Sequence, residues 1–232
     1  MKRKIRCCAF DSDGVLTNTA RCHFNAWCKL ATELDITLPA EFEPELSGIS
    51  RMNALKRVLE YGGILAEFTG PELKALTDQK NSYYQEEIQN LTSTAILPHI
   101  PSLLDELKNH GIKIIVASGS ANTPKVLQSV GLLSKFDGIV DPTVIPGKPA
   151  PDIFAKAAQI ASVAPNECIG IEDSLAGTQA IKKAGMIAIS IGTQAKFEGE
   201  SDFVVPNTNA LNYQLFKDIF NRVQQQSEIY EY

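Results

Sequence analysis

The spacing of apolar residues changes twice along the chain. A short continuous apolar run lies within residues 4–10 and ends at the first aspartate, which is typical of a buried strand. Between residues 18 and 90 the apolar positions recur every three or four residues, which predicts amphipathic helices. From residue 97 onward, short apolar runs alternate with helical periods, ending in a helix from about residue 210. The pattern therefore predicts a strand, a helical segment and then alternating helices and strands.

Turn and cap residues divide the helical segment into three predicted helices. Thr19 stands where the N-cap of the first helix is expected. The second helix, from Ser50, is expected to end at Gly62 and Gly63, and Pro71 suits the first turn of the third. We therefore expect residues 18–90 to be all-helical.

Strands that alternate with helices indicate a parallel sheet with helices on both faces. We predict an α/β fold with a Rossmann-like core formed by residues 1–17 and 91–232. Residues 18–90 are then an inserted helical cap domain, which leaves the sheet directly after the first strand. The family resemblance described below implies that such a cap determines substrate specificity and closes the active site.

Composition narrows the function classes without naming one. The chain has 232 residues and a net charge of -5, which argues against a nucleic-acid-binding surface. No apolar stretch approaches the ~20 residues that span a bilayer. The five cysteines form no CxxC pair, and Cys22, His23 and Cys28 match no common zinc spacing, so we expect neither a disulfide framework nor a zinc site. A cytoplasmic protein is the expectation.

Polar side chains follow four of the predicted strands, at the point where each strand ends. Each cluster alone has an ordinary explanation, since Asp-x-Asp is often a turn and a polar loop often caps a helix. In parallel sheets, however, ligands bind outside the carboxyl ends of the strands, so all four clusters should meet along one edge. The clusters are Asp11 and Asp13; Ser118, Ser120 and Asn122; Lys148; and Glu172 and Asp173.

The chemistry of these clusters points to phosphoryl transfer. Crowded carboxylates repel one another and any phosphate, and a hard cation such as Mg²⁺ removes both problems. A calcium loop does not fit, because with Asp11 as its first position Gly14 is the fourth, where the EF-hand needs glycine at the sixth. Lys148 and Ser118 can hold phosphoryl oxygens. One aspartate can attack phosphorus, and the other, its pKa raised by like charges, can move a proton.

The sequence resembles the haloacid dehalogenase-like phosphotransferases. The stretches "FDSDGVLT", "ASGSAN", "GKPAPDIF" and "GIEDSLAG" are similar to the four motifs of that family, in the same order. Within the family the chain is most similar to the β-phosphoglucomutases, through "TNTARCHFNAW", "LSGISR" and "QKNSYY". The resemblance covers nearly the whole chain.

The resemblance implies roles for the residues that match the motifs. Asp11 would be the nucleophile and a Mg²⁺ ligand, and Asp13 the general acid/base, with its main-chain carbonyl also touching the metal. Glu172 and Asp173 would complete the site for one Mg²⁺ per chain. Two further residues would bind the transferring phosphoryl group, Ser118 and Lys148.

The resemblance also implies a substrate-binding set, most of it in the cap. Arg51 would hold the second phosphate of the substrate, helped by Ser120 and Asn122 from the core. Trp27 lies on an apolar helical stripe, so packing is its main expected role, and His23 fits packing and binding equally. The residues expected to orient the sugar or couple closure to catalysis are Thr19, His23, Trp27, Gly48, Ser50 and Lys80.

The implied activity is a mutase that interconverts β-D-glucose 1-phosphate and glucose 6-phosphate. It would proceed through an aspartyl-phosphate and β-glucose 1,6-bisphosphate, which also serves as activator. A sugar-phosphate phosphatase is the alternative, and a phospho-accepting signalling receiver fits less well because receivers are about half this length. The expected partners are small sugar phosphates, with no nucleic acid or membrane, and the expected state is a monomer. Departures from the family pattern occur at Ser12, Asn18, His99 and Ala121.

Overall fold

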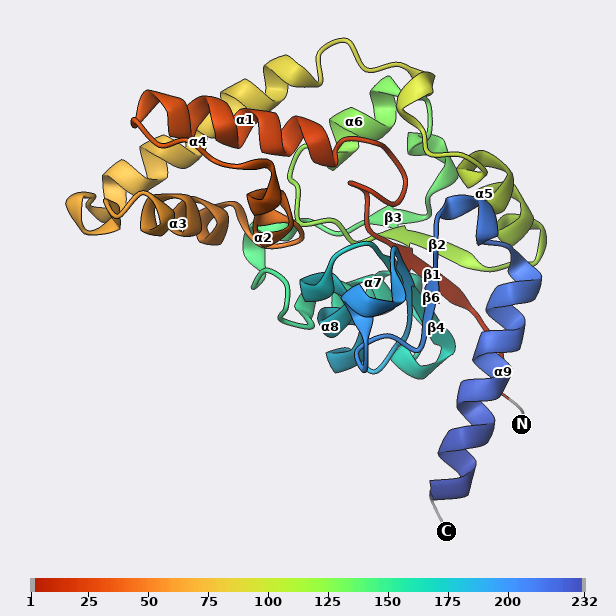
Figure 1. The fold of residues 1–232 in the computed structure, drawn as a ribbon. Coiled ribbons are helices and arrows are strands. Elements are labelled where there is room, and N and C mark those ends of the chain that lie inside the picture. Colours follow the sequence, from red (N-terminus) through yellow and green to blue (C-terminus); the bar gives the residue numbers. More distant parts are fainter. Residues whose placement is uncertain (1–2, 231–232) are drawn as a thin grey trace.

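The computed structural model describes residues 3–230, except for the side chains of residues 227–230. Its centre is a six-stranded sheet in the order β3-β2-β1-β4-β5-β6, and every neighbouring pair is parallel (Figure 1). The strands are β1 (Cys7–Phe10), β2 (Lys113–Val116), β3 (Gly138–Ile139), β4 (Cys168–Glu172), β5 (Ile187–Ile191) and β6 (Phe203–Val205).

The strand order places a switch point at β1. After β1 the chain builds β2 and β3 on one side, then crosses back to add β4, β5 and β6 on the other. Ala9 of β1 pairs with Ile115 of β2 and with Gly170 of β4, so the three strands end at the same edge. Crevices for ligands form at such switch points, beyond the carboxyl ends of the strands. Residues that follow β1, β2 and β4 therefore meet.

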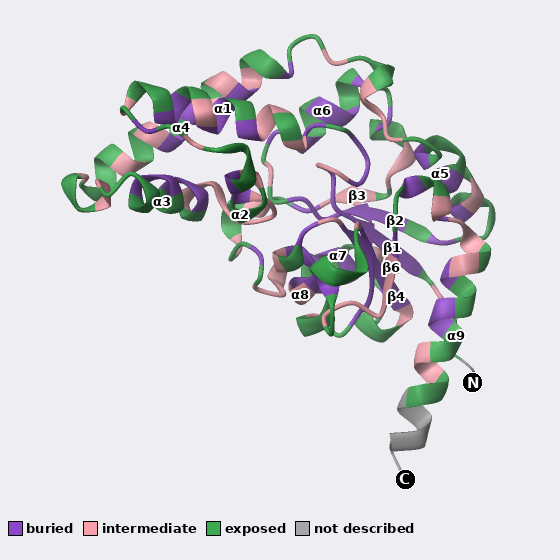
Figure 2. Ribbon diagram, viewed as in Figure 1, coloured by how far each residue is buried: buried purple, intermediate pink, exposed green. Residues whose placement is uncertain are grey.

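Helices cover both faces of the sheet, which confirms the predicted fold class. Side chains alternate along β1, so Cys8 and Phe10 belong to one apolar core and Cys7 and Ala9 to the other. Strands β1, β4 and β5 are buried along their whole length and β2 along all but its first residue, while the edge strands β3 and β6 are mostly half-buried (Figure 2). The first core packs against α5 (Ile100–Asn109), α6 (Thr123–Ser129) and α9 (Tyr213–Tyr230), and the second against α7 (Asp152–Ala161) and α8 (Leu175–Lys183).

Four helices between β1 and α5 form a layer of their own, called the cap below. They are α1 (Ala20–Glu33), α2 (Glu43–Leu46), α3 (Arg51–Tyr61) and α4 (Gly70–Glu87), and they lie over the carboxyl ends of the strands (Figure 1). The cap has a separate apolar cluster that includes Trp27, Leu30, Leu55 and Leu59. An independent core of this kind allows the cap to move as one body.

The two segments that connect the cap to the sheet are paired. Asn18 donates a backbone hydrogen bond to the carbonyl of Ala95 (2.8 Å), and Leu97 donates one to the carbonyl of Leu16 (3.0 Å). An isolated antiparallel bridge joins Thr17 to Ile96 between them. The chain thus enters and leaves the cap at one place.

Short 3₁₀ helices complete the described elements. They are η1 (Ala40–Phe42), η2 (Leu65–Glu67), η3 (Ser93–Ala95), η4 (Leu133–Lys135), η5 (Pro142–Val144), η6 (Pro165–Glu167), η7 (Gln194–Phe197) and η8 (Thr208–Ala210). Across residues 3–230, no helix is both long and apolar enough to cross a bilayer.

Several local predictions differ from the structure. The first strand begins at Cys7, where the chain first pairs with β2 and β4 in register, rather than at residue 4. Thr19 does precede α1, but its side chain makes no capping hydrogen bond, because its hydroxyl is used elsewhere. The last helix begins at Tyr213 instead of about residue 210, where η8 intervenes.

The backbone conformation at residue 99 shows why the family pattern has glycine at this position, where this chain has His99. It precedes α5 with a left-handed backbone conformation (φ 67°), which glycine adopts without cost and other residues adopt with strain. The Ser102 hydroxyl donates to the His99 carbonyl (2.8 Å) and holds this turn. The backbone geometry that favours glycine is thus retained with a histidine.

Candidate active site

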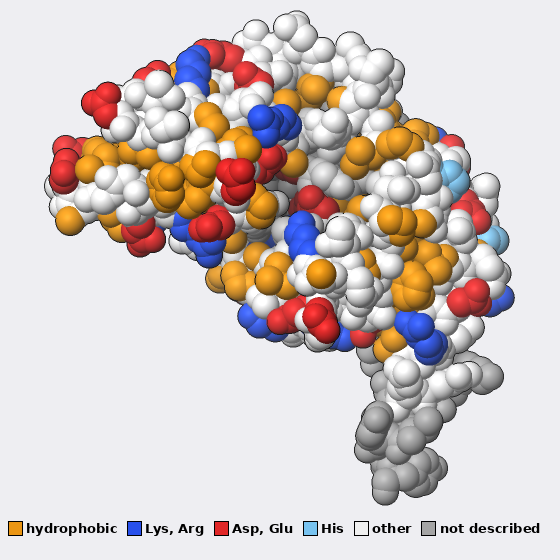
Figure 3. Space-filling view, in the orientation of Figure 1, with side chains coloured by type: hydrophobic (Ala, Val, Ile, Leu, Met, Phe, Trp, Pro, Cys, Tyr) orange, Lys and Arg blue, Asp and Glu red, His pale blue; other side chains and the backbone are white. Residues whose placement is uncertain are grey.

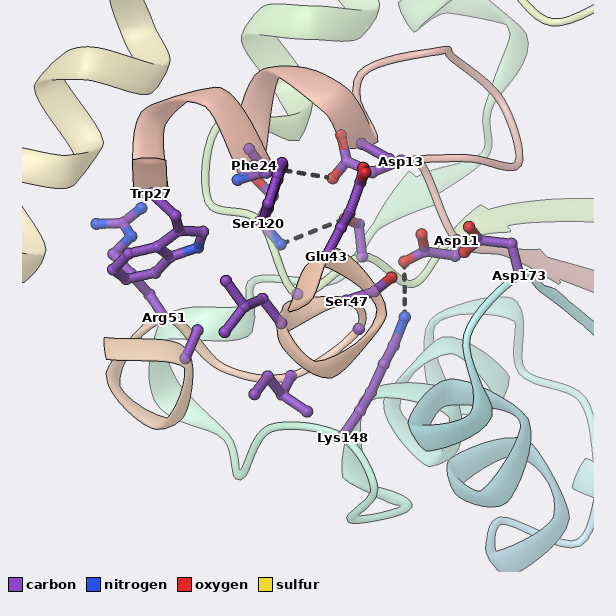
Figure 4. A pocket seen from close by; sticks show the side chains of 18 of the residues that line it. Asp11, Asp13, Phe24, Trp27, Glu43, Ser47, Arg51, Ser120, Lys148 and Asp173 are labelled. Carbon is purple, nitrogen blue, oxygen red and sulfur yellow. Dashed lines mark hydrogen bonds and ion pairs between the residues drawn. The ribbon is translucent and has the colours of Figure 1, made fainter. Parts of the chain in front are cut away.

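A pocket lies between the cap and the carboxyl ends of the strands. Figure 3 shows a hollow between these two parts of the molecule, with charged side chains at its margin. Figure 4 shows that the side chains lining it come from both parts, with Trp27 and Arg51 on the cap and Asp11 and Lys148 on the core. The pocket is therefore at the switch-point edge that the strand order favours.

Lys148 sits between two carboxylates on the floor of the pocket. Its ammonium donates to Asp11 Oδ1 at 2.6 Å and to Glu172 Oε1 at 2.5 Å, and its side chain is 2% exposed. Burial works against the charge on Lys148, but Asp11 and Glu172 outweigh it and hold the pKa of the lysine above its usual value. Burial, opposed by Lys148, raises the pKa of Asp11. Lys148 therefore stays charged beside the expected nucleophile.

The β4–α8 turn fixes Glu172. Glu172 Oε2 accepts hydrogen bonds from the Asp173 backbone N–H (2.9 Å), the Ser174 backbone N–H (2.8 Å) and the Ser174 hydroxyl (2.8 Å). This places the carboxylate at the N-terminal end of α8, where a negative charge is favoured. A Cβ on Gly177, one turn into α8, would lie only 1.9 Å from Glu172 Oε1. Glycine at 177 is therefore the residue that leaves room for the carboxylate.

Three carboxylates converge in a way that suits a hard cation. Oxygen atoms of Asp11, Glu172 and Asp173 all lie within 4.8 Å of one another. Burial and the neighbouring Glu172 raise the pKa of Asp173 to about 7, against the opposing effect of Lys196 and Lys148, so a further positive charge here would stabilise its ionised form. An all-oxygen donor set of this kind fits Mg²⁺.

Asp13 lies two residues after Asp11 but turns toward the cap. Its carboxylate accepts hydrogen bonds from the hydroxyls of Thr19 (2.5 Å) and Tyr84 (3.5 Å), and His23 Nε2 lies 3.4 Å away. Burial acts to raise the pKa of Asp13, but His23, the Thr19 hydrogen bond and Lys80 together hold it below its usual value.

The expectation that like charges raise the pKa of Asp13 is therefore wrong. The turn after β1 separates the two aspartates, so the acidic cluster surrounds Asp11 while hydrogen-bond donors surround Asp13. The backbone carbonyl of Ser12 accepts from the N–H groups of Leu16 (2.9 Å) and Thr17 (3.0 Å) and closes this turn. Within the described residues the buried Ser12 hydroxyl has no hydrogen-bond partner, and nothing in the structure explains its presence there.

Lys80 is the second buried lysine of the site and belongs to the cap. It is 2% exposed, with Nζ 2.8 Å from His23 Nδ1 and 4.7 Å from the centre of the Trp27 ring. Burial and the nearby Arg51 lower the pKa of Lys80 to about 7, and burial and Lys80 lower that of His23. Trp27 belongs to the apolar cluster of the cap, as expected for packing, and it also lines the pocket.

Most of the predicted site residues line the pocket. Those that do are Asp11, Asp13, His23, Trp27, Gly48, Arg51, Lys80, Ser118, Ser120, Lys148 and Asp173. The lining does not include Thr19, Ser50, Asn122 or Glu172, although Thr19 bonds to Asp13 and Glu172 to Lys148. Asn122 contacts the cap, donating to Asn81 Oδ1 (2.9 Å) and accepting from Gln85 Nε2 (3.2 Å). The roles assigned to these residues stay predictions.

Sequence reasoning missed several residues of the site. Glu43 of α2 lines the pocket and is paired with Arg21 of α1 at 3.0 Å. Nothing in the local sequence distinguishes Glu43 from other acidic residues at helix starts. Tyr84, four residues after Lys80 and thus on the same face of α4, could have been found from helical spacing.

Replacing Gly177 with alanine should disrupt the acidic cluster. The new methyl group would overlap the Glu172 carboxylate, so that carboxylate and Lys148 must both move. We expect a loss of about 1–3 kcal/mol in the free energy of unfolding. Binding of Mn²⁺, used as a paramagnetic substitute for Mg²⁺, should weaken at least about tenfold. Urea unfolding measures the free energy of unfolding, and electron paramagnetic resonance of free Mn²⁺ measures the affinity for the metal. Gly70→Ala is the matched control, since a Cβ there meets nothing within 4 Å, and an unchanged Gly177→Ala variant would contradict the prediction.

Comparison with known proteins agrees with this geometry. The family model for haloacid dehalogenase-like hydrolases matches residues 5–185. A β-phosphoglucomutase of Bacillus subtilis (strain 168) is 43% identical over 210 residues, which cover 90% of this chain and 92% of the relative. A fructose-1-phosphate phosphatase of Escherichia coli (strain K12) is 27% identical over 187 residues, which cover 78% of this chain and 94% of the relative.

A solved structure extends the similarity to the whole fold. The crystal structure of a β-phosphoglucomutase from Clostridium difficile superposes with a TM-score of 0.91 and 39% identity, covering 94% of this chain and 98% of that one. The chain therefore belongs to the haloacid dehalogenase-like hydrolase family, and it is similar over nearly its whole length to β-phosphoglucomutases.

Proposed function

We propose that this protein is a β-phosphoglucomutase that interconverts β-D-glucose 1-phosphate and glucose 6-phosphate. The observation that carries the proposal is the pair of cationic regions in one pocket. Lys148 lies beside Asp11 on the core, while Arg51 and Lys80 lie on the cap. Two phosphate-binding regions suit a bisphosphate intermediate. The similarity to β-phosphoglucomutases supports the same assignment.

In the proposed reaction Asp11 is the nucleophile. An Asp11 carboxylate oxygen attacks phosphorus of β-glucose 1,6-bisphosphate, the bond from phosphorus to the sugar oxygen breaks, and the phosphoryl group stays on Asp11. Lys148 and Ser118 hold the phosphoryl oxygens as negative charge develops on them. Phosphorylated Asp11 then passes the group to the 6-hydroxyl of a β-glucose 1-phosphate molecule, and the phosphorus–Asp11 bond breaks as the phosphorus–oxygen bond to the sugar forms. The bisphosphate so formed turns over and returns its C1 phosphate to Asp11, which leaves glucose 6-phosphate, so the bisphosphate is both intermediate and activator.

Asp13 moves the proton in both half-reactions. It gives a proton to the departing sugar oxygen and takes one from the attacking hydroxyl. Its low pKa in this structure corresponds to the ionised form, which is ready to accept a proton from a sugar hydroxyl. The hydrogen bond from Thr19 and the nearby His23 hold the carboxylate toward the pocket.

The acidic cluster would hold Mg²⁺. Asp11, Glu172 and Asp173 offer carboxylate oxygens, and the Asp13 main-chain carbonyl is the fourth expected ligand. When bound, the ion would neutralise negative charge between these carboxylates and the phosphoryl group. This charge balance is the reason to expect Mg²⁺ dependence.

The cap residues would bind the rest of the substrate. Arg51 would hold the second phosphate, with Ser120 and Asn122 on the core side. Glu43, a neighbour of these groups in the pocket, is an acceptor suited to sugar hydroxyls. The remaining residues of the proposed sugar site are Thr19, His23, Trp27, Gly48, Ser50 and Lys80. A monomer in the cytoplasm remains the prediction for the protein's state and location.

A sugar-phosphate phosphatase is the alternative. Its first half-reaction is the same, but water then accepts the phosphoryl group. Ala121 favours this alternative, because some family members have a lysine there near the distal phosphate, and the similarity to a fructose-1-phosphate phosphatase agrees with it. Arg51 and Lys80 favour the mutase, because they offer the cap a cation and a lysine that gains its charge when a phosphate binds nearby, and a monophosphate hydrolase has less use for both.

A coupled assay distinguishes the two activities. With Mg²⁺ and a trace of β-glucose 1,6-bisphosphate, β-glucose 1-phosphate should become glucose 6-phosphate, followed with glucose 6-phosphate dehydrogenase. Free phosphate is measured in the same samples. Product should exceed phosphate by at least about a hundredfold, because closure excludes water. Comparable rates of the two would identify a phosphatase.

The Asp13→Asn variant tests the proton-transfer role. The amide cannot accept or donate the proton, so turnover should fall by about 10²–10⁴-fold. Mn²⁺ affinity should change little, because the Asp13 side chain lies outside the carboxylate cluster. Near-normal turnover in the variant would rule out Asp13 as the acid/base, and a parallel loss of Mn²⁺ binding would indicate a structural role instead.

Substrate binding should take up a proton at Lys80. With its pKa at about 7, Lys80 is largely neutral at about pH 8 in the free protein, and a phosphate group placed nearby raises that pKa. Isothermal titration calorimetry with the bisphosphate, in two buffers of different ionisation enthalpy, should show net proton uptake at about pH 8 that disappears below about pH 6. Lys80→Met should abolish the uptake. Equal heats in both buffers for the unsubstituted protein would contradict this.

A further inference from the structure

The cap and the core touch at a glycine that precedes Lys148. A Cβ built on Gly147 would lie 2.9 Å from the Cβ of Ser50, 3.5 Å from its backbone nitrogen and 3.6 Å from its Cα. Real Cβ atoms do not approach one another so closely, so a side chain at 147 would force the two segments apart. The backbone of Gly147 does not have a positive φ, and the contact alone therefore disfavours a larger residue.

The two residues in contact are each next to a proposed phosphate-binding residue. Gly147 precedes Lys148, whose ammonium reaches Asp11. Ser50 is the N-cap of α3, its hydroxyl accepting from the Asn53 backbone N–H (3.3 Å), and α3 begins with Arg51. The Gly147–Ser50 contact thus joins the loop that holds the reacting phosphoryl group to the helix that holds the distal phosphate.

A second contact of the same kind lies nearby. A Cβ on Gly48 would be 2.1 Å from the Ser174 hydroxyl oxygen, and Ser174 belongs to the turn that fixes Glu172. The cap loop 47–50 therefore rests on two core loops, one before Lys148 and one after Asp173. In both contacts one partner is a glycine and the other a serine, which brings the two backbones close.

We propose that Gly147 is a positioning residue that sets the separation between Lys148 and Arg51 in the closed protein. The proposal rests on the proposed mutase function. With glycine at 147 the cap closes far enough for both phosphates of the intermediate to be held at once, and water is kept from the phosphorylated Asp11. A side chain at 147 holds the cap slightly open, which weakens the grip on the bisphosphate and lets water compete for the phosphoryl group.

The test is the partition of the phosphorylated enzyme between sugar and water. Glucose 6-phosphate formed and phosphate released are measured together for the unsubstituted protein, Gly147→Ala and Gly147→Val. We expect the ratio of phosphate to product to rise about three- to tenfold for alanine and further for valine, as misplacement of about 1 Å can cost up to a hundredfold. Gly70→Ala is the control, because a Cβ at this position in the cap meets nothing within 4 Å. This variant should have the same ratio of phosphate to product as the unsubstituted protein.

A double variant separates closure from a local effect on Lys148. Ser50→Gly removes the Cβ that the new side chain would meet, and glycine is tolerated at an N-cap. The Ser50→Gly/Gly147→Ala protein should return to the ratio of Ser50→Gly alone. A ratio that stays high in the double variant, or one that never rises in the single variants, overturns the proposal. Comparable phosphate and product rates in the unsubstituted protein would instead show that the mutase assignment has failed.

Discussion

The site depends on one buried ammonium placed between two buried carboxylates. Without Lys148, Asp11 and Glu172 would be two adjacent anions with little access to water, and breaking a buried ion pair of this kind costs about 3–5 kcal/mol. Much of the remaining structure serves this arrangement. β1 and β4 deliver Asp11 and Glu172 to the same edge, and the loop before α7 brings Lys148 in from the side.

The same constraint explains why the two aspartates after β1 have different environments. Asp11 faces the carboxylates and Lys148, so its charge is useful only when a cation or a phosphoryl group shares the space. Asp13 faces hydrogen-bond donors on the cap, which stabilise its ionised form. Two residues of one type, two positions apart, thus acquire different properties, which suit the nucleophile and the proton carrier proposed above.

Sequence alone predicted the parts of the site that follow from strand ends. The motifs after β1, β2 and β4 stood at the carboxyl ends of their strands, and the parallel sheet brings those ends together. Lys148 lies farther from its strand, in the loop between η5 and α7. The direction of the Asp13 side chain was not predictable, because it depends on Thr19, His23 and Tyr84 meeting it across the pocket. Glu43 and Gly177 were missed for a similar reason, since their importance lies in contacts with residues distant in the sequence.

The paired connection between cap and sheet makes it easy for a cap to be inserted into an existing sheet during evolution. Because Asn18 and Leu97 bond to the opposite connecting segment, the cap begins and ends on neighbouring backbone, and the sheet needs only a short gap after β1 to receive it. Inserting a segment with its own apolar core at such a point adds little loop-closure entropy, which grows slowly with loop length. The acidic cluster at the edge of the sheet and the cap residues that line the pocket can therefore change separately during evolution, because only the paired connecting segments join the two parts of the chain.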